Sequence, residues 1–483
     1  MPIVTKHILF IGDCTNKKIH LNLPAIDLLI TSPPYFNAPF DYNELFQNYE
    51  SFLALMAKFG KLYFKSLKPG GIAGINIDDM LIRGIKYPII SDTVKIFEKI
   101  GYILQGRVVW KKPEGYIRIS RRSGVLLQNP FPMYFYPDNI VESILIFQKP
   151  TLKTSESSKT VNYDDIWEIT NVLPIKGRLE ENIAAFPDEL PKRLISSFTK
   201  EYAWICDPFL GSGTTMKVAR ELNRNSVGIE ILNSLIPVIR KKTGFTPETL
   251  SGFFNKDRFI ITEIDEDGRK RENNSNSKES SYSLLSETLE REETIERNYK
   301  YHLVFLDCRG RSKRIINKEL SDLLKRLFPG RILVVYYDFL NKNVDRMTLN
   351  QLTDFIMQNG LRLRDKITVQ HQVEDQWSVK TEFTEVCFNH CYYEVFIFQK
   401  GKFDYKSKTK HEKEDSLINK ENFQLGKWYL SLWEFKNLPR SLCDPIVTSR
   451  ILELFLFNEE VVCSNIPNLK CINRRFILDY FNY

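Results

Sequence analysis

The sequence lacks any apolar run long enough to span a membrane, and its first residues lack the layered pattern of a secretory signal peptide. Cysteine is also sparse, with 8 residues scattered over a chain of 483. Secreted proteins that depend on disulfides carry cysteines far more densely, so this usage favours a reducing intracellular environment. We therefore expect a cytoplasmic protein with no membrane-bound segment.

A metal site is disfavoured for a similar reason. Cys387, His390 and Cys391 lie close together, but no second pair of ligands follows at the spacing of a zinc finger. What the chain does have is ample apolar content, 43%, and a formal net charge of +8. This content and length are enough for two cores, and a modestly basic chain suits a polyanionic partner.

The first informative motif is the tetrapeptide Ser32-Pro33-Pro34-Tyr35, which follows the short apolar run 28–31. A buried strand that stops at two prolines puts its last side chains at the carboxyl edge of a sheet, where open α/β proteins bind ligands. Because proline fixes φ and lacks an N–H, the turn is stiff and its carbonyls are held in place as acceptors. Alone, the motif would indicate only a strand followed by a turn.

A second motif follows much later. Residues 204–215 read as a strand that ends in Asp207 and a glycine turn, after which a helix begins. Glycines allow a ligand to approach the backbone, and a helix N-terminus offers free N–H groups. Glu230 ends the next expected strand, about 20 residues on, at the spacing where an acidic side chain can bind ribose hydroxyls. The turn lacks the Gly-Lys-Ser/Thr ending of a phosphate-binding loop, which favours a nucleoside-containing ligand over a nucleoside triphosphate.

Together the two motifs resemble those of the DNA amino-methyltransferases, which transfer a methyl group from S-adenosyl-L-methionine to an exocyclic amine of cytosine or adenine. That family has Ser/Asn/Asp-Pro-Pro-Tyr/Phe as its catalytic motif and Asp-Pro-Phe-x-Gly-Ser-Gly-Thr-Thr as its cofactor loop. Here the catalytic motif comes first, as in the beta class. The resemblance departs from the family at Ile183-Ala184-Ala185, where His-Pro is common.

The resemblance implies an α/β, Rossmann-like methyltransferase fold with a mostly parallel sheet, and it assigns the site residues. Asp13 is expected near the adenine of the cofactor, and Phe186 at its methionine end. The implied catalytic residues are Ser32, Pro33, Pro34 and Tyr35. The implied cofactor-binding residues are Asp13, Thr31, Phe186, Asp207, Pro208, Phe209, Gly211, Ser212, Gly213, Thr214, Thr215 and Glu230.

The residue types suit this chemistry. The lone pair of an exocyclic amine is conjugated into the ring, so the amine is a poor nucleophile. Ser32 Oγ and the Pro33 carbonyl can accept its two hydrogens and direct its lone pair at the methyl group, without a covalent intermediate. The base must leave the duplex, and Tyr35 or Phe36 would stack on it. None of the cysteines follows a proline, which disfavours the thiolate route to carbon 5 of cytosine.

Serine at the first position of the catalytic motif favours cytosine N4, because the family more often uses Asp or Asn for adenine N6. The sequence therefore predicts a DNA cytosine-N4 methyltransferase of a restriction-modification system, acting on double-stranded DNA alongside a cognate restriction endonuclease. Three alternatives stay open. They are an adenine-N6 methyltransferase, a methyltransferase of RNA or protein, and a non-catalytic nucleic-acid-binding protein on a vestigial fold.

A basic and aromatic segment indicates where the DNA would bind. It lies within 107–140, between two expected strands, and is typical of a long hairpin loop next to the catalytic edge. Its cations would contact phosphates or guanine, although such runs are usually solvated loops. The residues expected to contact DNA are Arg107, Lys111, Lys112, Arg118, Arg121 and Arg122.

The second half of the chain resembles a degenerate copy of the first. We expect a catalytic domain at 1–263, a polar linker at 264–299 and a methyltransferase-like domain at 300–483. Collinear matches mark the internal repeat: 303–306 with 28–31, 328–334 with 68–74, Gly360 with Gly101, 396–400 with 145–149, and 432–435 with 166–169.

This copy has lost the chemistry. Asp307-Cys308-Arg309-Gly310 stands where the catalytic motif should be, and no glycine loop survives near 461–467. We expect the second domain to bind neither cofactor nor base, and the chain to be a monomer with an internal pseudo-dimer whose second domain widens the DNA surface. Structural support for the first domain is the competing explanation, and a fused nuclease accounts for the segment less well.

Overall fold

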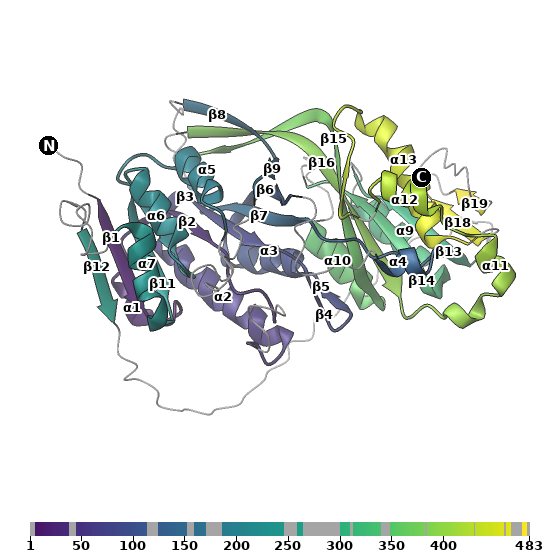
Figure 1. Ribbon diagram of the computed structural model, residues 1–483, viewed down its shortest axis with the longest axis horizontal. Coiled ribbons are helices and arrows are strands. Elements are labelled where there is room, and N and C mark those ends of the chain that lie inside the picture. Colours follow the sequence, from purple (N-terminus) through teal and green to yellow (C-terminus); the bar gives the residue numbers. More distant parts are fainter. Residues whose placement is uncertain are drawn as a thin grey trace.

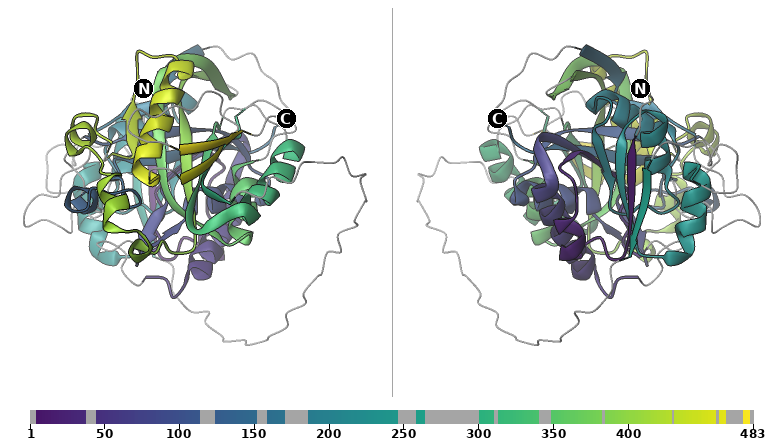
Figure 2. Two further views of the ribbon diagram at one scale, coloured as in Figure 1. Left: turned by 90° about the vertical axis from the view of Figure 1, so that its right-hand side faces the viewer. Right: turned by 90° about the vertical axis from the view of Figure 1, so that its left-hand side faces the viewer.

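Two α/β units lie side by side along the long axis of the molecule, the first coloured purple to teal and the second green to yellow (Figure 1). Figure 2 shows the same molecule from its two ends, with the second unit nearer the viewer on the left and the first unit nearer on the right. No helix in the part of the chain that is described is both long and apolar enough to cross a membrane. This computed structural model describes residues 5–37, 45–113, 124–151, 159–170, 186–245, 258–263, 300–309, 313–339, 348–381, 384–428, 430–457, 460–464 and 476–480.

The first unit is built on a nine-stranded sheet. Most neighbouring strands are parallel, whereas β7 runs antiparallel to both of its neighbours. The predicted mostly parallel sheet is therefore confirmed. The strand order is β12 (Arg258–Glu263), β1 (Lys6–Ile11), β11 (Asn225–Glu230), β10 (Trp204–Asp207), β2 (Ile26–Thr31), β3 (Leu67–Ile77), β7 (Val141–Gln148), β6 (Ile103–Lys111) and β9 (Ile166–Glu168).

The central strand β2 has a continuous apolar run at 28–30 because helices cover both faces of the sheet. Leu28 and Ile30 pack on the side of α5 and α6, and Leu29 packs on the side of α2 and α3. Successive side chains of a strand alternate between faces, so a doubly covered strand needs a continuous apolar run. The helices of this unit are α1 (Lys17–Leu21), α2 (Tyr49–Ser66), α3 (Ile89–Ile100), α4 (Gly124–Gln128), α5 (Glu189–Phe198), α6 (Thr214–Glu221) and α7 (Ile236–Thr243), and a small hairpin joins β4 (Met80–Ile82) to β5 (Ile85–Tyr87).

The second unit has an eight-stranded sheet, to which the first unit contributes β8 (Lys159–Asp164). Its other strands follow the order β17 (Leu432–Glu434), β15 (Leu361–Lys380), β16 (Thr384–Lys400), β14 (Leu327–Tyr337), β13 (Tyr301–Asp307), β18 (Glu460–Ser464) and β19 (Phe476–Tyr480). Its helices are α9 (Lys313–Arg326), α10 (Leu349–Gln358), α11 (Lys410–Glu414), α12 (Lys420–Leu425) and α13 (Arg440–Phe455).

The two sheets share one topology. The order β9-β6-β7-β3-β2-β10-β11 in the first sheet matches β17-β15-β16-β14-β13-β18-β19 in the second, and each matching pair has the same relative direction. The register agrees as well, since Leu28 lies opposite Ile72 and Leu303 lies opposite Ile332. This agreement supports the interpretation of the second unit as a copy of the first.

The same side-chain contacts hold the first residues of β3 in the first unit and of β14 in the second unit. Gln148 Nε2 donates to Gly70 O at 3.1 Å, and Gln399 Nε2 donates to Gly330 O at 3.0 Å. Both glycines have a positive φ, 77° and 80°, which favours a residue without Cβ. The contact of Lys149 Nζ with Leu67 O (2.7 Å) likewise matches that of Lys400 Nζ with Leu327 O (2.9 Å).

The sequence predicts that the connection between β6 and β7 is a hairpin loop that projects next to the catalytic edge. In the structure it does not project freely. Leu126, Met133 and Phe135 are fully buried in the core of the second unit, among side chains such as Leu303 and Ile332. Apolar residues of this segment therefore serve as core of the other unit, and that expectation is wrong for the described residues 124–140. Residues 114–123 lie outside the described part of the chain.

The matching connection of the second unit crosses in the opposite direction. The far part of the β15–β16 hairpin packs Trp377 and Phe388 into the core of the first unit, beside Trp167 and Leu194. Thr384 Oγ1 also donates to the Ser197 carbonyl in α5 at 2.6 Å, and β8 pairs with β16 along the hairpin. Each unit thus completes the core of the other.

Buried ions cross the boundary in the same reciprocal way. Arg107 on β6 binds Glu394 of the second unit at 2.6 Å, with both side chains 0% exposed. Lys366 occupies the matching position on β15 and binds Asp78 of the first unit at 3.3 Å. The matching helices α3 and α10 also meet there, where Ser91 Oγ contacts Asn350. Matching elements of the two units thus face each other across this boundary, each supplying a buried cation to a carboxylate of the other unit.

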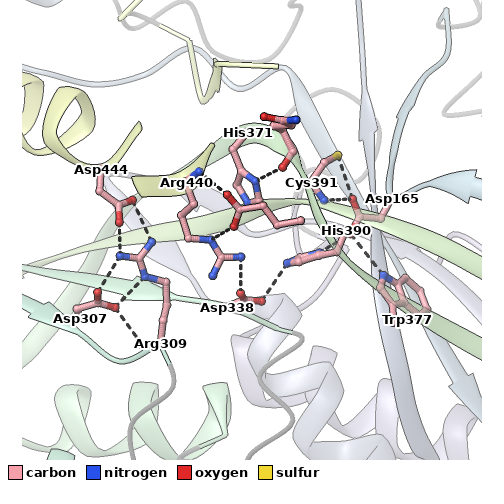
Figure 3. A network of polar contacts seen from close by, with 12 residues as sticks. Asp165, Asp307, Arg309, Asp338, His371, Trp377, His390, Cys391, Arg440 and Asp444 are labelled. Atoms are coloured by element: carbon pink, nitrogen blue, oxygen red, sulfur yellow. Dashed lines mark hydrogen bonds and ion pairs between the residues drawn. The ribbon is translucent and has the colours of Figure 1, made fainter. Parts of the chain in front are cut away.

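The cysteine and histidine pair considered for a metal takes part in this boundary. His390 lies between Asp165 of the first unit (2.6 Å) and Asp338 (3.0 Å), and Cys391 Sγ contacts Asp165 at 3.3 Å (Figure 3). Burial opposes the charge on His390, but the hydrogen bonds to the two carboxylates outweigh it and raise its pKa to about 9. This histidine therefore serves as a buried cation between the two units.

Candidate active site

The two sequence motifs meet at the carboxyl edge of the first sheet. Thr31 Oγ1, the last residue of β2, donates to Asp207 Oδ1 at 2.8 Å. Asp207 ends the neighbouring strand β10 and also accepts from Thr215 Oγ1 at 2.6 Å and from Phe209 N at 3.1 Å. Burial raises the pKa of Asp207 to about 6, against the effect of these hydrogen bonds. The carboxylate therefore joins the catalytic turn to the glycine loop.

The glycine loop leads from β10 into α6 and is held by the next strand. Gly211 and Gly213 have positive φ values of 55° and 91°, so a side chain at either position would be strained. Gly211 N donates to Glu230 Oε2 and Leu232 N donates to Oε1, both at 2.9 Å. Burial raises the pKa of Glu230. Backbone N–H groups of Gly211, Ile231 and Leu232 all act on this carboxylate, so they use most of its roughly four acceptor sites.

A lysine that sequence reasoning missed lies against the same loop. Lys242 Nζ, from α7, donates to Ser212 Oγ at 2.8 Å and to Thr214 Oγ1 at 2.6 Å. Burial lowers its pKa, while the charge of Asp188 acts to raise it. A cation thus lies between the loop and the start of α5. Its sequence context, a short basic helix end, gave no signal of this position.

The catalytic turn is tied to two further strands. Tyr35 OH donates to Glu142 Oε2 at 2.8 Å, and burial, together with the charge of Glu142, raises the pKa of Tyr35 well above its usual range. Asn76 Nδ2 donates to Glu142 Oε2 at 2.8 Å, and it contacts Tyr35 OH at 3.1 Å and Ser32 Oγ at 3.4 Å. Lys112 pairs with the other oxygen of Glu142. Asn76 and Glu142 lie together because β7 is antiparallel to β3, which brings its first residues to the carboxyl edge.

The remaining predicted residues take different positions. Asp13 follows β1, is exposed, and accepts from Thr15 N at 2.7 Å, so it caps a turn beside the end of β11. Phe186 is 8% exposed and packs in the core near α5. Phe36 is buried against Tyr49 and Tyr87, so the expectation that it can stack on a base is wrong. Pro33, Pro34, Pro208 and Phe209 lie in the two turns themselves.

The residues expected to contact DNA divide into three groups. For Arg107 the expectation is wrong, because its buried guanidinium is paired with Glu394 and cannot reach a phosphate. Lys111 is 12% exposed and pairs with Glu168 and Glu434, and Lys112 is 19% exposed. The other three predicted residues, Arg118, Arg121 and Arg122, lie outside the described residues.

The matching edge of the second unit is closed by its own side chains. Arg309 follows β13 at the position that matches Pro34 of the first unit, and it binds Asp307 and Asp444, each at 2.7 Å (Figure 3). Its guanidinium lies 5.1 Å from the ring centre of Tyr336 and 4.6 Å from that of Tyr393. The space that faces Ser32 and Tyr35 in the first unit is therefore filled in the second by an ion pair between aromatic rings.

The fold and the joined motifs define a Rossmann-like methyltransferase. Comparison with known proteins supports this class and identifies a family within it. The family model described as DNA methylase matches residues 26–241. The type II methyltransferase M.MjaI of Methanocaldococcus jannaschii is 31% identical over 300 residues, which cover 53% of this chain and 97% of that relative. The chain belongs to the DNA methylase family and is a DNA methyltransferase dependent on S-adenosyl-L-methionine.

Other similarities are more partial. The type II beta methyltransferase M.BslI of a Bacillus species is 28% identical over 239 residues, and the match spans 44% of this chain but only 25% of M.BslI. Among solved structures, the PvuII DNA methyltransferase, described as cytosine-N4-specific, is 19% identical with a TM-score of 0.40 and covers 52% of this chain and 90% of its own. The match to M.MjaI uses nearly all of that relative, so about half of the present chain has no counterpart in it.

Proposed function

We propose that this protein transfers a methyl group to the exocyclic N4 amine of a cytosine that has been turned out of double-stranded DNA, at the carboxyl edge of the first unit. The observation that carries the proposal is the position of Ser32. It directly follows Thr31, whose hydroxyl is bonded to the carboxylate of the cofactor loop, so base and cofactor would meet at this turn.

The cofactor fits the residues around Glu230. The acceptor capacity left on its carboxylate suits a hydroxyl of the ribose. Ile231 and Leu232, which follow it, are 67% and 55% exposed and offer an apolar surface to an adenine ring beside Asp13. When bound, S-adenosyl-L-methionine supplies a methyl group on a positively charged sulfur.

The other end of the cofactor site is formed by the glycine loop and α5. Lys242 places a positive charge next to Ser212 and Thr214 that suits a carboxylate such as that of the methionine moiety. Phe186 starts the α5 segment and closes this end with an aromatic side chain. Asp207 acts on the site through others, because its oxygens hold the residues that shape the loop.

The chain's part in the reaction is to position the amine. Ser32 Oγ and the Pro33 carbonyl accept the two hydrogens of the amine, which turns its lone pair toward the methyl group. Tyr35 holds its ring against the base, with its hydroxyl fixed on Glu142. Pro33 and Pro34 keep the acceptors in place without cost at the moment of reaction, which is the basis of electrostatic preorganisation.

The DNA would approach this edge along the β6–β7 connection. Lys112 contacts Glu142 at the catalytic turn, so the chain that carries Arg118, Arg121 and Arg122 starts at the site itself. These three arginines remain our candidates for contacts with phosphates or guanine. Methylation of a fixed site would then protect it from a cognate restriction endonuclease.

The choice between cytosine N4 and adenine N6 is tested by the product. Purified protein is incubated with S-adenosyl-L-methionine and with DNA that contains no modified bases, and the nucleosides are separated and identified by mass spectrometry. We expect N4-methylcytosine. N6-methyladenine would replace this proposal with the adenine alternative, and methylation of RNA or protein in parallel reactions, but not of DNA, would overturn it.

A further inference from the structure

The internal repeat acts as a control that separates residues needed by the fold from residues needed by the chemistry. Both units keep a glutamine, a lysine and a glycine that hold the start of β3 in the first unit and of β14 in the second, with matching contacts. Their geometry is the same although only one unit has a Ser-Pro-Pro-Tyr turn. Residues kept in both units therefore serve the fold.

Two side chains beside the catalytic turn, Asn76 and Glu142, are not kept in the second unit. Strand register places Tyr336 where the first unit has Asn76, and Tyr393 where it has Glu142. Both units fold with the same strand order, so neither Asn76 nor Glu142 is required by the sheet. They occur in the unit that has Ser32 and are replaced in the unit that has Asp307 at the matching position.

The polar contacts of Asn76 are also costly for a purely structural residue. Its side chain is buried, at 3% exposure, and in the described part of the chain Oδ1 has no hydrogen-bond partner. A buried polar atom without a partner costs about 1–3 kcal/mol. The matching tyrosine avoids this cost, because Tyr336 OH is within 2.8 Å of Thr448 Oγ1.

We propose that Asn76 and Glu142 are positioning residues of the methyl transfer. Asn76 orients the Ser32 hydroxyl and Glu142 fixes the ring of Tyr35, so that both face the amine. The Nδ2 group of Asn76 uses one of the two acceptor sites of Ser32 Oγ and leaves the other for a hydrogen of the amine. Glu142 accepts from Tyr35 and Asn76 through the same oxygen, so it couples the stacking surface to the acceptor.

Lys112 completes the arrangement. It pairs with the second oxygen of Glu142 and lies 5.2 Å from the ring centre of Trp110, which keeps the cation at the edge of the site. A carboxylate that is only 13% exposed needs such a counter-charge. This contact gives Lys112 a role in the site that does not depend on DNA.

The inference rests on the proposed function, and kinetics of the full-length protein test it separately. We compare the wild type with Asn76→Ala, Glu142→Ala, Glu142→Gln and Tyr35→Phe, measuring kcat, KM for DNA, the Kd of S-adenosyl-L-methionine and the melting temperature. Gln399→Ala is the control, because it removes a part-buried hydrogen bond of the second unit that lies away from the catalytic turn.

We expect kcat to fall by about 10- to 100-fold in Asn76→Ala and Glu142→Ala, the cost of a reacting group displaced by about 1 Å. The cofactor Kd should stay within about twofold, because these residues do not touch the glycine loop. Glu142→Gln should recover most of kcat, since its amide oxygen can still accept from Tyr35. Gln399→Ala should lower the melting temperature and leave kcat unchanged.

The inference is overturned if folded Asn76→Ala and Glu142→Ala keep the wild-type kcat. It is also overturned if kcat, cofactor affinity and melting temperature fall together, which is the signature of a structural role. Should Glu142→Ala fail to fold, Tyr35→Phe decides, because it removes a single hydroxyl and should still lower kcat. A wild-type protein that does not methylate DNA would instead refute the proposed function.

Discussion

The two units of this chain have the same strand order, but different side chains occupy the carboxyl edges of their sheets. In the first, Thr31 and Asp207 bond to each other and leave Ser32 at the edge. In the second, Asp307 holds Arg309 over the site. The fold has survived without the chemistry, because strand order and turn contacts depend on residues away from this edge.

The comparison also shows what the second unit contributes to the fold of the first. Each unit lends a segment to the core of the other: the β6–β7 connection enters the second unit, and the β15–β16 hairpin enters the first. Segments of this kind bury large apolar side chains, so loss of either would expose both cores. The second unit is therefore part of the folded state of the first, whatever it adds to DNA binding.

We expect the largest difference between the units when matching residues at the two edges are each replaced by alanine. Ser32→Ala removes an acceptor of the amine, and we expect methyl transfer to fall about 10²- to 10³-fold, as when one preorganised polar contact is removed from an active site. Asp307→Ala, at the matching position, should leave the rate unchanged. Initial rates with labelled S-adenosyl-L-methionine measure both. Equal losses in the two variants would show that the second edge takes part in the reaction.

The interlocked cores predict a large loss of stability from one side chain of the second unit. Trp377 is 7% exposed and its ring lies against Gly106 of the first unit, where an added Cβ would come within 2.5 Å of it. We expect Trp377→Ala to lower the free energy of unfolding by about 3–5 kcal/mol in denaturant titrations. Val373→Ala, at an exposed position on the same strand, is the control. Two separate unfolding transitions in the wild type would contradict one cooperative unit.

We expect cofactor binding to be weakened by a substitution in the first unit and not by the matching substitution in the second. Asp207→Ala removes the carboxylate that holds Thr31, Thr215 and the loop, and we expect S-adenosyl-L-methionine to bind about 100-fold more weakly, roughly the cost of one hydrogen bond to a charged group. Ser464→Ala, at the matching position on β18, should bind the cofactor like the wild type. Calorimetry of the two variants would contradict the account if they lost affinity equally.

The smallest expected effect is a pH dependence of that affinity. All three bonds to Asp207 are donated to it, so they are strongest to the ionised carboxylate, and burial raises its pKa to about 6 from 3.8. A raised pKa means that this group adds stability below about pH 3.8 and loses that share as the pH rises through 6. Cofactor affinity should behave in the opposite way and fall about fivefold between pH 6 and 5, as the ionised fraction of a group with a pKa near 6 does.

A non-titrating variant provides the check on this dependence. Asp207→Asn should bind the cofactor weakly, and its affinity should not fall between pH 6 and 5 through this group. Because burial raises the pKa of Glu230 too, a fall that persists in Asp207→Asn would assign the pH dependence to Glu230 instead. An unchanged wild-type affinity down to pH 5 would contradict both.

Much of the fold and part of the site could be predicted from the sequence. The matches between the units were visible because Gly70 and Gln148, like Gly330 and Gln399, are kept for the fold. The meeting of Thr31 with Asp207 follows from two strands that end in recognisable motifs. Asn76 and Glu142 gave no signal, since a single polar residue near the end of an apolar strand looks like the start of a turn.

The errors at Arg107 and in the segment 124–140 have one physical cause, whereas Phe36 is buried by its own unit. The basic and aromatic pattern predicts a DNA-contacting loop at 107–140, yet Arg107 and much of the described segment 124–140 are buried. Their burial comes from the second unit, which supplies Glu394 and the surrounding core. Local sequence shows which side chains are apolar or charged, but not which surface another part of the chain covers.

The number of cofactor molecules bound by each chain tests the central claim most directly. Titration of the full-length protein with S-adenosyl-L-methionine in a calorimeter should give one site per chain, and Asp207→Ala should bring that value close to zero. Two sites per chain, or one site that survives in Asp207→Ala, would contradict the conclusion that only the first unit retains the methyltransferase site.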